Sequence, residues 1–354
     1  MQNTKSNRKT LIIPAAGGST RYSTKKPKWL LTHPHGSLMI EEVVGALNLE
    51  EYDEKHIVIL KEHCSKYNAD VILKQLFGDE FKITILEEPT ASAPETVMEC
   101  VVRNSIEGNI IIKDCDCLVE FDFPEEDNFV VSLDINKQAV KNLPSKSFIL
   151  YNQDDIIDAI IEKKVVSSSV CLGVYSLDCH AFCYAFDELT QIASRNDQEL
   201  YFSHIVSYLI GKGVIFTATE ASKFIDWGTQ QEWVEYTSNL KTYIFDIDGV
   251  LLENRGKYGI ETWENTFKPI EENIEVLKSL SDKGAEIIFI TSRTEEYLGQ
   301  FKDYLKDKGI EYKTIISGCN HNRRIIVNDF FATNPFPSCE AINVPRNGSL
   351  GEYL

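Results

Sequence analysis

Two aspartates that follow an apolar run near residue 245 form the most specific chemical feature of the sequence. The run TYIF at residues 242–245 is typical of a buried strand, and DIDGV follows it at 246–250. Alternate strand residues point the same way, so Asp246 and Asp248 are expected to converge on one cation in the turn. Gly249 permits a tight backbone beside a phosphate. Such a pair can supply a nucleophile, an acid/base group and metal ligands for phosphate chemistry.

Two later strand-like segments also end in polar residues. IIFI at 287–290 leads into Thr291, and RIIVN at 324–328 leads into Asp329. In this order, the three segments resemble motifs I, II and IV of the haloacid dehalogenase (HAD) superfamily. The resemblance implies an aspartyl-phosphate on Asp246, proton transfer by Asp248 and a phosphate hydrogen bond from Thr291. It also implies that Mg²⁺ is held by Asp246, Asp248 and Asp329.

The basic residue that the HAD family uses as motif III has no obvious counterpart. Arg324 is our choice, and Arg323 and Lys313 are alternatives. Only 43 positions separate Asp248 from Thr291, which leaves no room for a large cap. We therefore expect an open site, with substrate contacts from Tyr258, Trp263, Arg293 and Tyr297. The tail NPFPS and AINVPRNG resembles the capless sugar-phosphatase-like domains found in surface-polysaccharide gene products.

A second candidate site lies near the beginning of the chain. The apolar run at residues 10–14 is followed by the small-residue loop AAGGSTR at 15–21, and the strongest local basic cluster follows. Glycines let a backbone approach a phosphate and present its N–H groups. The pattern is neither a P-loop nor a dinucleotide-binding fingerprint. The basic cluster consists of Arg21, Lys25, Lys26 and Lys28.

This loop, with its arginine and the following Pro27-Lys28, resembles the signature of the sugar-phosphate nucleotidyltransferases, over residues 9–236. The resemblance implies that Arg21 contacts the β- and γ-phosphates and that Lys28 bridges the nucleotide and the incoming phosphate. It also implies a Mg²⁺ ion on two acids, for which we choose Asp116 and Asp226, with Asp114 as the alternative to Asp116. The loop that would cradle the nucleotide comprises Ala15, Ala16, Gly17 and Gly18.

Base recognition is expected from the same loop and from residues 88–95, with Glu88 and Ser92 as candidates. The chain reads ASAP at 91–94 where the family often has Gly-Ala, so the base stays open, with CTP as first choice. CLGVY at 171–175 resembles the acceptor-side strand of the family, and Glu162 is a candidate for the sugar side.

The elements that must position these residues alternate along the chain. We expect buried strands at 56–60, 83–86, 109–112 and 129–133, and antiparallel strands within 147–175. Helices are expected at 38–48, 67–77, 94–105, 199–211 and 270–283. The polar link at 237–240 separates two α/β domains. The first, 9–236, would be a Rossmann-like, GT-A-like nucleotidyltransferase with a mixed sheet. The second, 241–354, would be a HAD-like three-layer α/β/α domain without a large cap.

Composition narrows the classes of partner. The formal net charge is −18, which disfavours general nucleic-acid binding, including processing of nucleic-acid ends. No run of 18 apolar residues occurs, so membrane insertion is not expected. The nine cysteines are odd in number and scattered, which is typical of free thiols in the cytoplasm. The sequence leaves open whether the chain forms a homo-oligomer.

The leading hypothesis is a bifunctional enzyme with one Mg²⁺ per domain. One domain would transfer a nucleotidyl group from a nucleoside triphosphate to a sugar or polyol phosphate, with release of pyrophosphate. The other would hydrolyse a phosphate monoester in the same pathway, the synthesis of surface-polysaccharide precursors. The alternatives are a chain with one active domain and one scaffold domain, and a nucleotide-binding regulator without turnover.

Overall fold

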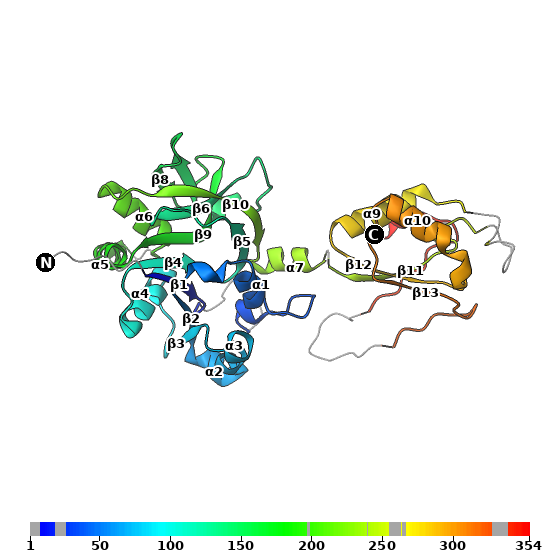
Figure 1. Cartoon of the computed structure of the whole chain (residues 1–354), viewed down its shortest axis with the longest axis horizontal. Coiled ribbons are helices and arrows are strands. Elements are labelled where there is room, and N and C mark those ends of the chain that lie inside the picture. The colour runs from blue at the N-terminus through cyan, green and yellow to red at the C-terminus, as the bar shows by residue number, and fades with distance from the viewer. Residues whose placement is uncertain are drawn as a thin grey trace. The chain divides into compact units, whose positions relative to one another are not determined.

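The chain folds into two compact units, Met1–Trp233 (unit 1) and Val234–Leu354 (unit 2). The computed structural model describes residues 8–17, 26–196, 199–238, 240–254, 263, 267–327 and 339–354. Figure 1 shows the elements of each unit. Helix α7, Gln230–Ser238, spans the division between the units. Within the described residues, no helix is long and apolar enough to cross a membrane.

The described residues of unit 1 form a ten-stranded mixed sheet with the order β3-β2-β1-β4-β9-β6-β10-β5; β7 joins it by pairing with β9, and β8 pairs with β7. Strands β3, β2, β1 and β4 run parallel, whereas β9 is antiparallel to both β4 and β6. The strands are β1 Lys9–Pro14, β2 Glu54–Leu60, β3 Lys82–Leu86, β4 Asn109–Lys113, β5 Cys117–Phe121, β6 Phe129–Asp134, β7 Phe148–Tyr151, β8 Ile157–Ile161, β9 Ser169–Asp178 and β10 Thr217–Asp226.

Helices cover both faces of this sheet. Alternation along β1 sends Ile12 into one core with α4, α5 and α6, and Leu11 and Ile13 into a second core with α1 and α3. A sheet buried on both faces explains why its strands read as continuous apolar runs. The helices are α1 Met39–Gly45, α2 Lys61–Tyr67, α3 Ala69–Phe77, α4 Ala93–Asn104, α5 Cys179–Asn196 and α6 Phe202–Gly211, with short 3₁₀ helices at Lys28–Leu30, Leu49–Glu51 and Leu143–Ser145.

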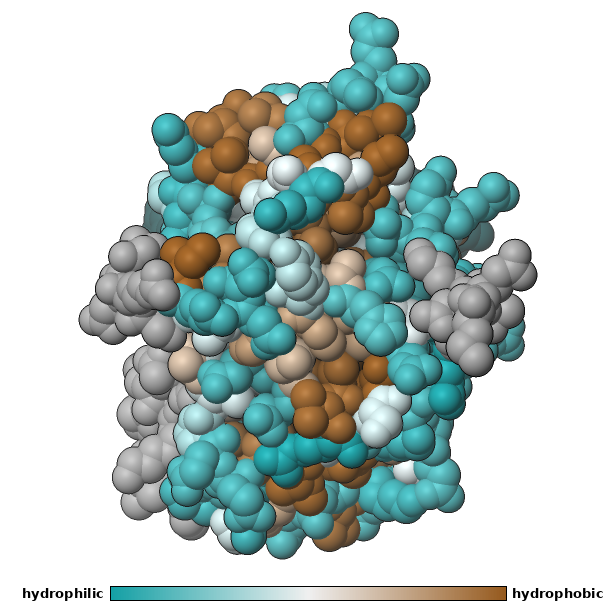
Figure 2. Space-filling model, turned by 90° about the vertical axis from the view of Figure 1, so that its left-hand side faces the viewer, coloured by the Kyte–Doolittle hydropathy of each residue, from teal (hydrophilic) through white to brown (hydrophobic). Residues whose placement is uncertain are grey.

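The structure confirms the four predicted strands and the antiparallel strands predicted within residues 147–175, but β3 is an edge strand in which Ile85 is 38% exposed, so only three of the four are buried as predicted. The helix predicted at 67–77 forms as α3, after a separate helix α2 that the sequence analysis missed. Asn68 divides the two helices because its backbone is left-handed, with φ 53°. One face of the molecule, seen in Figure 2, carries hydrophobic patches between hydrophilic residues.

The described residues of unit 2 form three parallel strands in the order β11-β12-β13. The elements are β11 Thr242–Asp246, α9 Glu271–Asp282, β12 Glu286–Ile290, α10 Gly299–Asp307 and β13 Thr314–Ile316, with 3₁₀ helices at Glu295–Tyr297 and Leu350–Glu352. Phe245 and Phe289 pack with apolar residues of α9 and α10, whereas Ile244 and Ile316 are each 48% exposed. The described residues of unit 2 thus form two layers, and the three layers expected from the sequence are not formed by them.

The strand predicted at 324–328 is wrong for the residues that the structure describes. Residues 324–327 have no strand partner, and Ile325 and Val327 are 78% and 91% exposed. The Arg324 guanidinium donates to the carbonyl oxygens of Asn320 and Asn322, at 2.6 and 2.7 Å. These bonds hold the segment in a loop, where its β-branched residues do not extend the sheet. The predicted metal ligand Asp329 lies outside the described residues.

Candidate active sites in the two units

The loop after β1 is fixed by backbone contacts at its start. Ala15 N donates to the Val58 carbonyl at 2.8 Å, and the Trp29 indole donates to the Ala15 carbonyl at 3.0 Å. Ala15 and Ala16 are each 1% exposed, while a Cβ added at Gly17 would meet nothing within 4 Å. The start of the loop is therefore buried and hydrogen-bonded, and the chain becomes exposed at Gly17. The predicted residues Gly18 and Arg21 lie outside the described residues.

Strand pairing brings Asp116 and Asp226 together from distant parts of the sequence. Asp226, at the end of β10, is opposite Cys117, at the start of the antiparallel strand β5. The next residue, Trp227, donates its N–H to the Asp116 carbonyl at 2.9 Å. A Cβ added at Gly228 would lie 3.1 Å from Asp226 Oδ1 and 3.4 Å from Asp116 Oδ2. Both carboxylates thus face the same small space, in which a Cβ at position 228 would be in tight contact with them.

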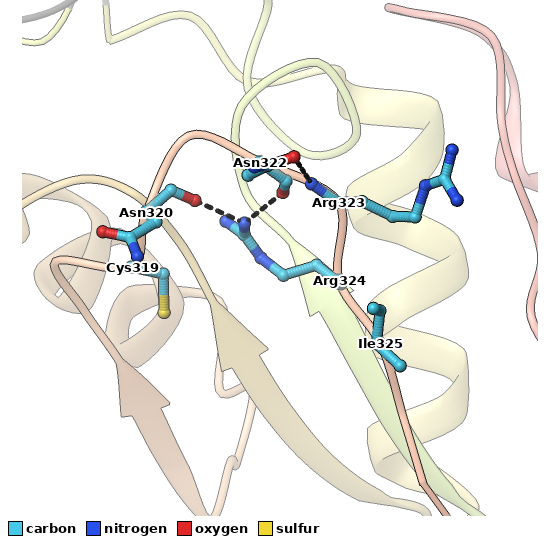
Figure 3. Close-up of a pocket in the computed structure, with 6 residues that line it drawn as sticks. All are labelled: Cys319, Asn320, Asn322, Arg323, Arg324 and Ile325. Atoms are coloured by element: carbon cyan, nitrogen blue, oxygen red, sulfur yellow. Dashed lines mark hydrogen bonds between the residues drawn. The ribbon is translucent and has the colours of Figure 1, made fainter.

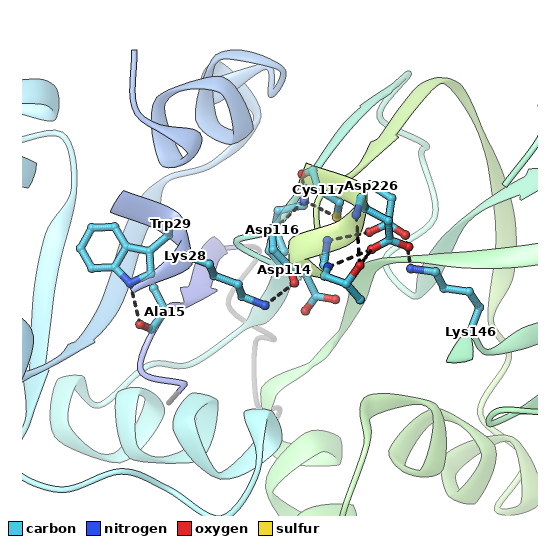
Figure 4. A network of polar contacts seen from close by, with 12 residues as sticks. Ala15, Lys28, Trp29, Asp114, Asp116, Cys117, Lys146 and Asp226 are labelled. Atoms are coloured by element: carbon cyan, nitrogen blue, oxygen red, sulfur yellow. Dashed lines mark hydrogen bonds and ion pairs between the residues drawn. The ribbon is translucent and has the colours of Figure 1, made fainter. Parts of the chain in front are cut away.

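Two lysines neutralise this pair of carboxylates. Lys28 forms an ion pair with Asp116, and Lys146 forms one with Asp226. Figure 4 shows the two lysines reaching the carboxylates from opposite sides. All four side chains are less than 20% exposed, so these pairs are only weakly screened by solvent. Burial alone would lower the pKa of Lys146, but the nearby carboxylates of Asp226, Glu232 and Asp116 raise it overall.

The pair of carboxylates is compatible with a magnesium ion. Among the described residues, no three acidic, cysteine or histidine side chains form a group that could hold a metal ion alone. Mg²⁺ is commonly held by one or two carboxylates together with water and substrate phosphates. Asp116 and Asp226 therefore suit a metal that binds together with a phosphorylated substrate.

Asp114 lies beside this pair but faces another strand. A Cβ added at Gly173 of β9 would lie 2.2 Å from Asp114 Oδ2, so the carboxylate packs directly against that backbone. Burial, followed by the charge of Asp116, raises the pKa of Asp114 to about 6. Asp116, not Asp114, shares the space at Gly228 with Asp226.

The substitution Asp114→Asn is expected to remove the contribution of Asp114 to the pH dependence of the free energy of unfolding. Because the folded-state pKa is raised, folding favours the protonated carboxyl, and the free energy of unfolding falls as pH rises from about 4 through 6. Relative to Asp114→Asn, the natural protein should lose on the order of 1–3 kcal/mol over this range. Denaturant unfolding with chelator present, followed by tryptophan fluorescence, measures the difference. If the free energies of unfolding of the two proteins change with pH in parallel from pH 4 to 7, Asp114 does not have a raised pKa in the folded protein.

Three residues of this site were not predicted from the sequence. Lys113 is fully buried, and its ammonium donates to the Asp114 and Cys117 carbonyls at 2.7 Å each, which clamps the turn that carries Asp116. A lysine directly after the apolar run at 109–112 is a signal that could have identified it. Lys146 and Glu232 have no such signal, because each reaches the site through the fold.

The residues proposed for base recognition lie beyond the end of β3, at the same sheet edge as the β1 loop. Glu88 is exposed. Ser92 is the N-cap of α4, where its hydroxyl accepts a hydrogen bond from Glu95 N at 3.3 Å. Its side chain therefore has a structural task that stabilises the helix. Glu162, proposed for the sugar side, accepts hydrogen bonds from the hydroxyls of Ser147 and Ser203.

In unit 2, the ends of adjacent parallel strands bring Asp246 and Thr291 to one edge. Asp246 is opposite Ile290 in the ladder, and the buried Thr291 follows Ile290 directly. The Asp246 carboxylate accepts a hydrogen bond from Ile247 N at 3.0 Å. Burial, reinforced by the charge of Asp248 and opposed by Arg324 and His321, raises the pKa of Asp246.

Asp248 is engaged by Arg293, which the sequence analysis had named only as a substrate contact. The guanidinium donates to Oδ1 from Nη2 at 2.6 Å and to Oδ2 from Nε at 2.9 Å. Arg293 is 2% exposed, and its N–H donates to Thr291 Oγ1 at 3.1 Å. One guanidinium thus contacts both carboxylate oxygens of Asp248.

The charge of Arg324, like that of His321, opposes the rise in the pKa of Asp246. The Arg324 guanidinium also donates to Ser292 Oγ at 3.3 Å. Lys313, which directly precedes β13, instead pairs with Glu286, the first residue of β12. Figure 3 shows Arg323 extending away from Arg324. The shallow pocket in this figure is lined by Cys319, Asn320, Asn322, Arg323, Arg324 and Ile325.

Of the predicted substrate contacts in unit 2, Trp263 and Tyr297 lie together. Their ring centroids are 5.6 Å apart, and Trp263 also stacks on His321 at 6.1 Å. The charge of His321, on which Trp263 stacks, also opposes the rise in the pKa of Asp246. Tyr258 lies outside the described residues.

Comparison with known proteins assigns the fold of unit 1. No family model and no curated protein matches the sequence. Solved structures of nucleotidyltransferases do match, each over about two thirds of the chain. A nucleoside-diphosphate-sugar pyrophosphorylase from Vibrio cholerae RC9 aligns with a TM-score of 0.56 at 20% identity, covering 64% of this chain and 99% of that one.

Two further solved structures agree with this assignment. The inositol-1-phosphate CTP transferase from T. maritima has a TM-score of 0.51 at 13% identity, covering 64% of this chain and 92% of that one. A UDP-glucose pyrophosphorylase complexed with UDP-glucose has a TM-score of 0.50 at 15% identity, covering 65% and 97%. At these identities the likeness establishes the fold, a mixed α/β nucleotidyltransferase fold of Rossmann type. It confirms the fold expected for the first domain and does not extend to a HAD-like second domain.

Proposed function

We propose that unit 1 transfers a nucleotidyl group from a nucleoside triphosphate to the phosphate of a sugar or polyol, with release of pyrophosphate. The observation that carries this proposal is the space at Gly228, where Asp116 and Asp226 meet and a lysine approaches each of them. Paired carboxylates and lysines beside a small-residue loop suit a reaction between two anionic phosphates. The fold shared with sugar pyrophosphorylases supports the same reading.

The reaction joins two substrates without a covalent enzyme intermediate. An oxygen of the acceptor phosphate attacks the α-phosphorus of the nucleotide, a new P–O bond forms, and the bond to the β-phosphate bridging oxygen breaks. Pyrophosphate leaves with the electron pair. The loop from Ala15 to Gly18 would hold the nucleotide, and Arg21 and Lys28 would neutralise its phosphates. The contribution of the protein is positioning and charge compensation.

Magnesium would be held by Asp116 and Asp226, which fit it as described above, and when bound it neutralises phosphate oxygens. Without it, the ammonium groups of Lys28 and Lys146 compensate the same carboxylates. CTP is our first choice of nucleotide. One structure of the same fold is described as an inositol-1-phosphate CTP transferase, which agrees with a cytidine nucleotide and a polyol phosphate.

For unit 2 we propose hydrolysis of a phosphate monoester from the same pathway. A carboxylate oxygen of Asp246 would attack the phosphorus, the ester P–O bond would break, and the leaving oxygen would take a proton. Water would then hydrolyse the aspartyl-phosphate. Thr291 and Arg324 would bind the phosphate, and Asp248 would transfer the proton once Arg293 releases it. The raised pKa of Asp246 and the nearby Arg324 support this reading. Asp246, Asp248 and Asp329 would hold a second Mg²⁺.

A substrate screen tests the first activity. The full chain is incubated with Mg²⁺, each of the four common nucleoside triphosphates and a panel of sugar and polyol phosphates, and pyrophosphate is measured. We expect pyrophosphate only when an acceptor phosphate is present, and first with CTP. Nucleotide binding without pyrophosphate for any acceptor would overturn the proposal and favour a regulatory protein. A parallel assay of inorganic phosphate release tests whether unit 2 is active or serves as a scaffold.

A further inference from the structure

Lys146 enters the carboxylate site of unit 1 from the side that the nucleotide-binding residues leave unused. The β1 loop, Lys28 and residues 88–92 belong to the first half of the fold, and Lys28 reaches Asp116 from that direction. Lys146 comes from the segment before β7 and reaches Asp226 from the opposite direction, as Figure 4 shows. The two lysines therefore serve different sides of the space at Gly228.

The Lys146 backbone is fixed while its side chain ends in an ion pair. Its N–H donates to the Leu143 carbonyl and its carbonyl accepts from Lys163 N, each at 3.1 Å. The side chain is 19% exposed and that of Asp226 is 13% exposed. Glu232 lies beside this pair, and its Oε1 is buried without a hydrogen bond among the described residues. An ammonium group in this position stays charged and has more than one anion within its field.

A divalent cation on Asp226 and the Lys146 ammonium compete for the same carboxylate. When the cation occupies that carboxylate, its charge repels the ammonium, which must turn to another anion. Polar contacts already surround Lys146 on this side. The hydroxyls of Ser147, the next residue, and of the buried Ser203 both donate hydrogen bonds to Glu162. The phosphate of an acceptor that enters from this side would supply the anion that the displaced Lys146 ammonium needs.

We propose that Lys146 is the acceptor-side cation of the transfer reaction: it neutralises Asp226 in the metal-free protein and binds the acceptor's phosphate monoester when a divalent cation takes its place. The inference rests on the nucleotidyl transfer proposed above and adds a residue to it. Lys146 thereby makes entry of the acceptor dependent on prior binding of the metal, because the ammonium is released only then. The acceptor class that it selects is a phosphate monoester that carries two negative charges.

The test compares Lys146→Met with the natural full-length protein in two measurements. In the first, Mn²⁺ is titrated without nucleotide and free ion is followed by electron paramagnetic resonance. Loss of the competing ammonium should tighten Mn²⁺ binding about 3- to 10-fold. In the second, steady-state pyrophosphate release should show kcat/KM for the acceptor falling about 100-fold, while KM for the nucleotide changes less than about 3-fold. Lys146→Arg should restore a large part of the acceptor effect.

Lys137→Met is the matched control, because Lys137 pairs with Glu220 and its side chain is 63% exposed. It should leave both measurements unchanged. Mn²⁺ binding that is weaker or unchanged in Lys146→Met would overturn the proposal, as would equal losses for acceptor and nucleotide. If the natural protein releases no pyrophosphate with any acceptor, the proposed function fails. The Mn²⁺ titration alone then decides whether Lys146 competes with the metal.

Discussion

Replacing Asp226 by asparagine is expected to lower the rate of pyrophosphate release by about 10²–10³-fold, because it weakens the hold on a metal ion that would stabilise transition-state charge. The amide keeps the shape of the side chain but removes the charge that both Lys146 and a metal ion would use. Steady-state pyrophosphate release with saturating nucleotide and acceptor measures the change. Phosphate release by unit 2 should stay within about 2-fold of the natural protein, because Asp226 belongs to unit 1.

Asp122→Asn is the control for this prediction, since Asp122 is exposed just beyond the other end of β5. It should retain full activity. Circular dichroism verifies that both variants are folded. An Asp226→Asn protein that is folded and retains more than about a third of its activity would show that the carboxylate is not part of the transfer site.

Asp246→Asn is expected to abolish phosphate release, with a loss on the order of 10⁴-fold or more, as for other enzymes that lose a nucleophile. An amide oxygen is a poor nucleophile and cannot form the aspartyl-phosphate. Release of inorganic phosphate from sugar and polyol phosphates measures the effect. Pyrophosphate release by unit 1 should be unchanged, which separates this variant from Asp226→Asn.

The matched control is Asp307→Asn, an exposed carboxylate at the end of α10. Phosphate release should be the same in this variant and in the natural protein. If Asp246→Asn and the natural protein hydrolyse the same esters at similar rates, then Asp246 is not the nucleophile. If neither protein hydrolyses any ester on the panel, unit 2 is a scaffold.

The sequence predicted residues that lie at strand ends better than residues that reach a site from elsewhere. Four predicted site residues lie at or just beyond a strand end, which can be recognised from the sequence alone: Asp116, Asp226, Asp246 and Thr291. That Asp116 and Asp226 meet depends on the antiparallel pairing of β5 with β10, which no local pattern encodes. Local patterns could therefore identify the two carboxylates, and only the family resemblance paired them.

Lys146 and Arg293 illustrate what local patterns cannot provide. Lys146 lies in a polar loop segment, NLPSKS, with the appearance of an ordinary surface residue. Only the fold brings it to Asp226. Arg293 was expected to contact substrate, yet its guanidinium engages both oxygens of Asp248. An ion pair formed across two strand ends depends on register and burial, which are tertiary properties.

The segment at 324–327 shows the opposite error, because its local pattern predicted a strand that does not form. Its β-branched residues have high strand propensity, but propensity depends on a partner that buries them. Here Arg324 binds the carbonyls of Asn320 and Asn322, and Ile325 is 78% exposed. The interpretation as motif IV therefore loses its strand among the described residues, while Arg324 keeps its electrostatic effect on Asp246.

The origin of the bridging oxygen in the product tests the central claim most directly. An acceptor phosphate labelled with ¹⁸O at its non-bridging oxygens is incubated with CTP, Mg²⁺ and the full chain, and the products are followed by ³¹P NMR. Attack by the acceptor on the α-phosphorus predicts a new P–O–P linkage with an ¹⁸O isotope shift on both of its phosphorus atoms, together with unlabelled pyrophosphate. Consumption of the nucleotide with no labelled P–O–P linkage in the products would contradict nucleotidyl transfer.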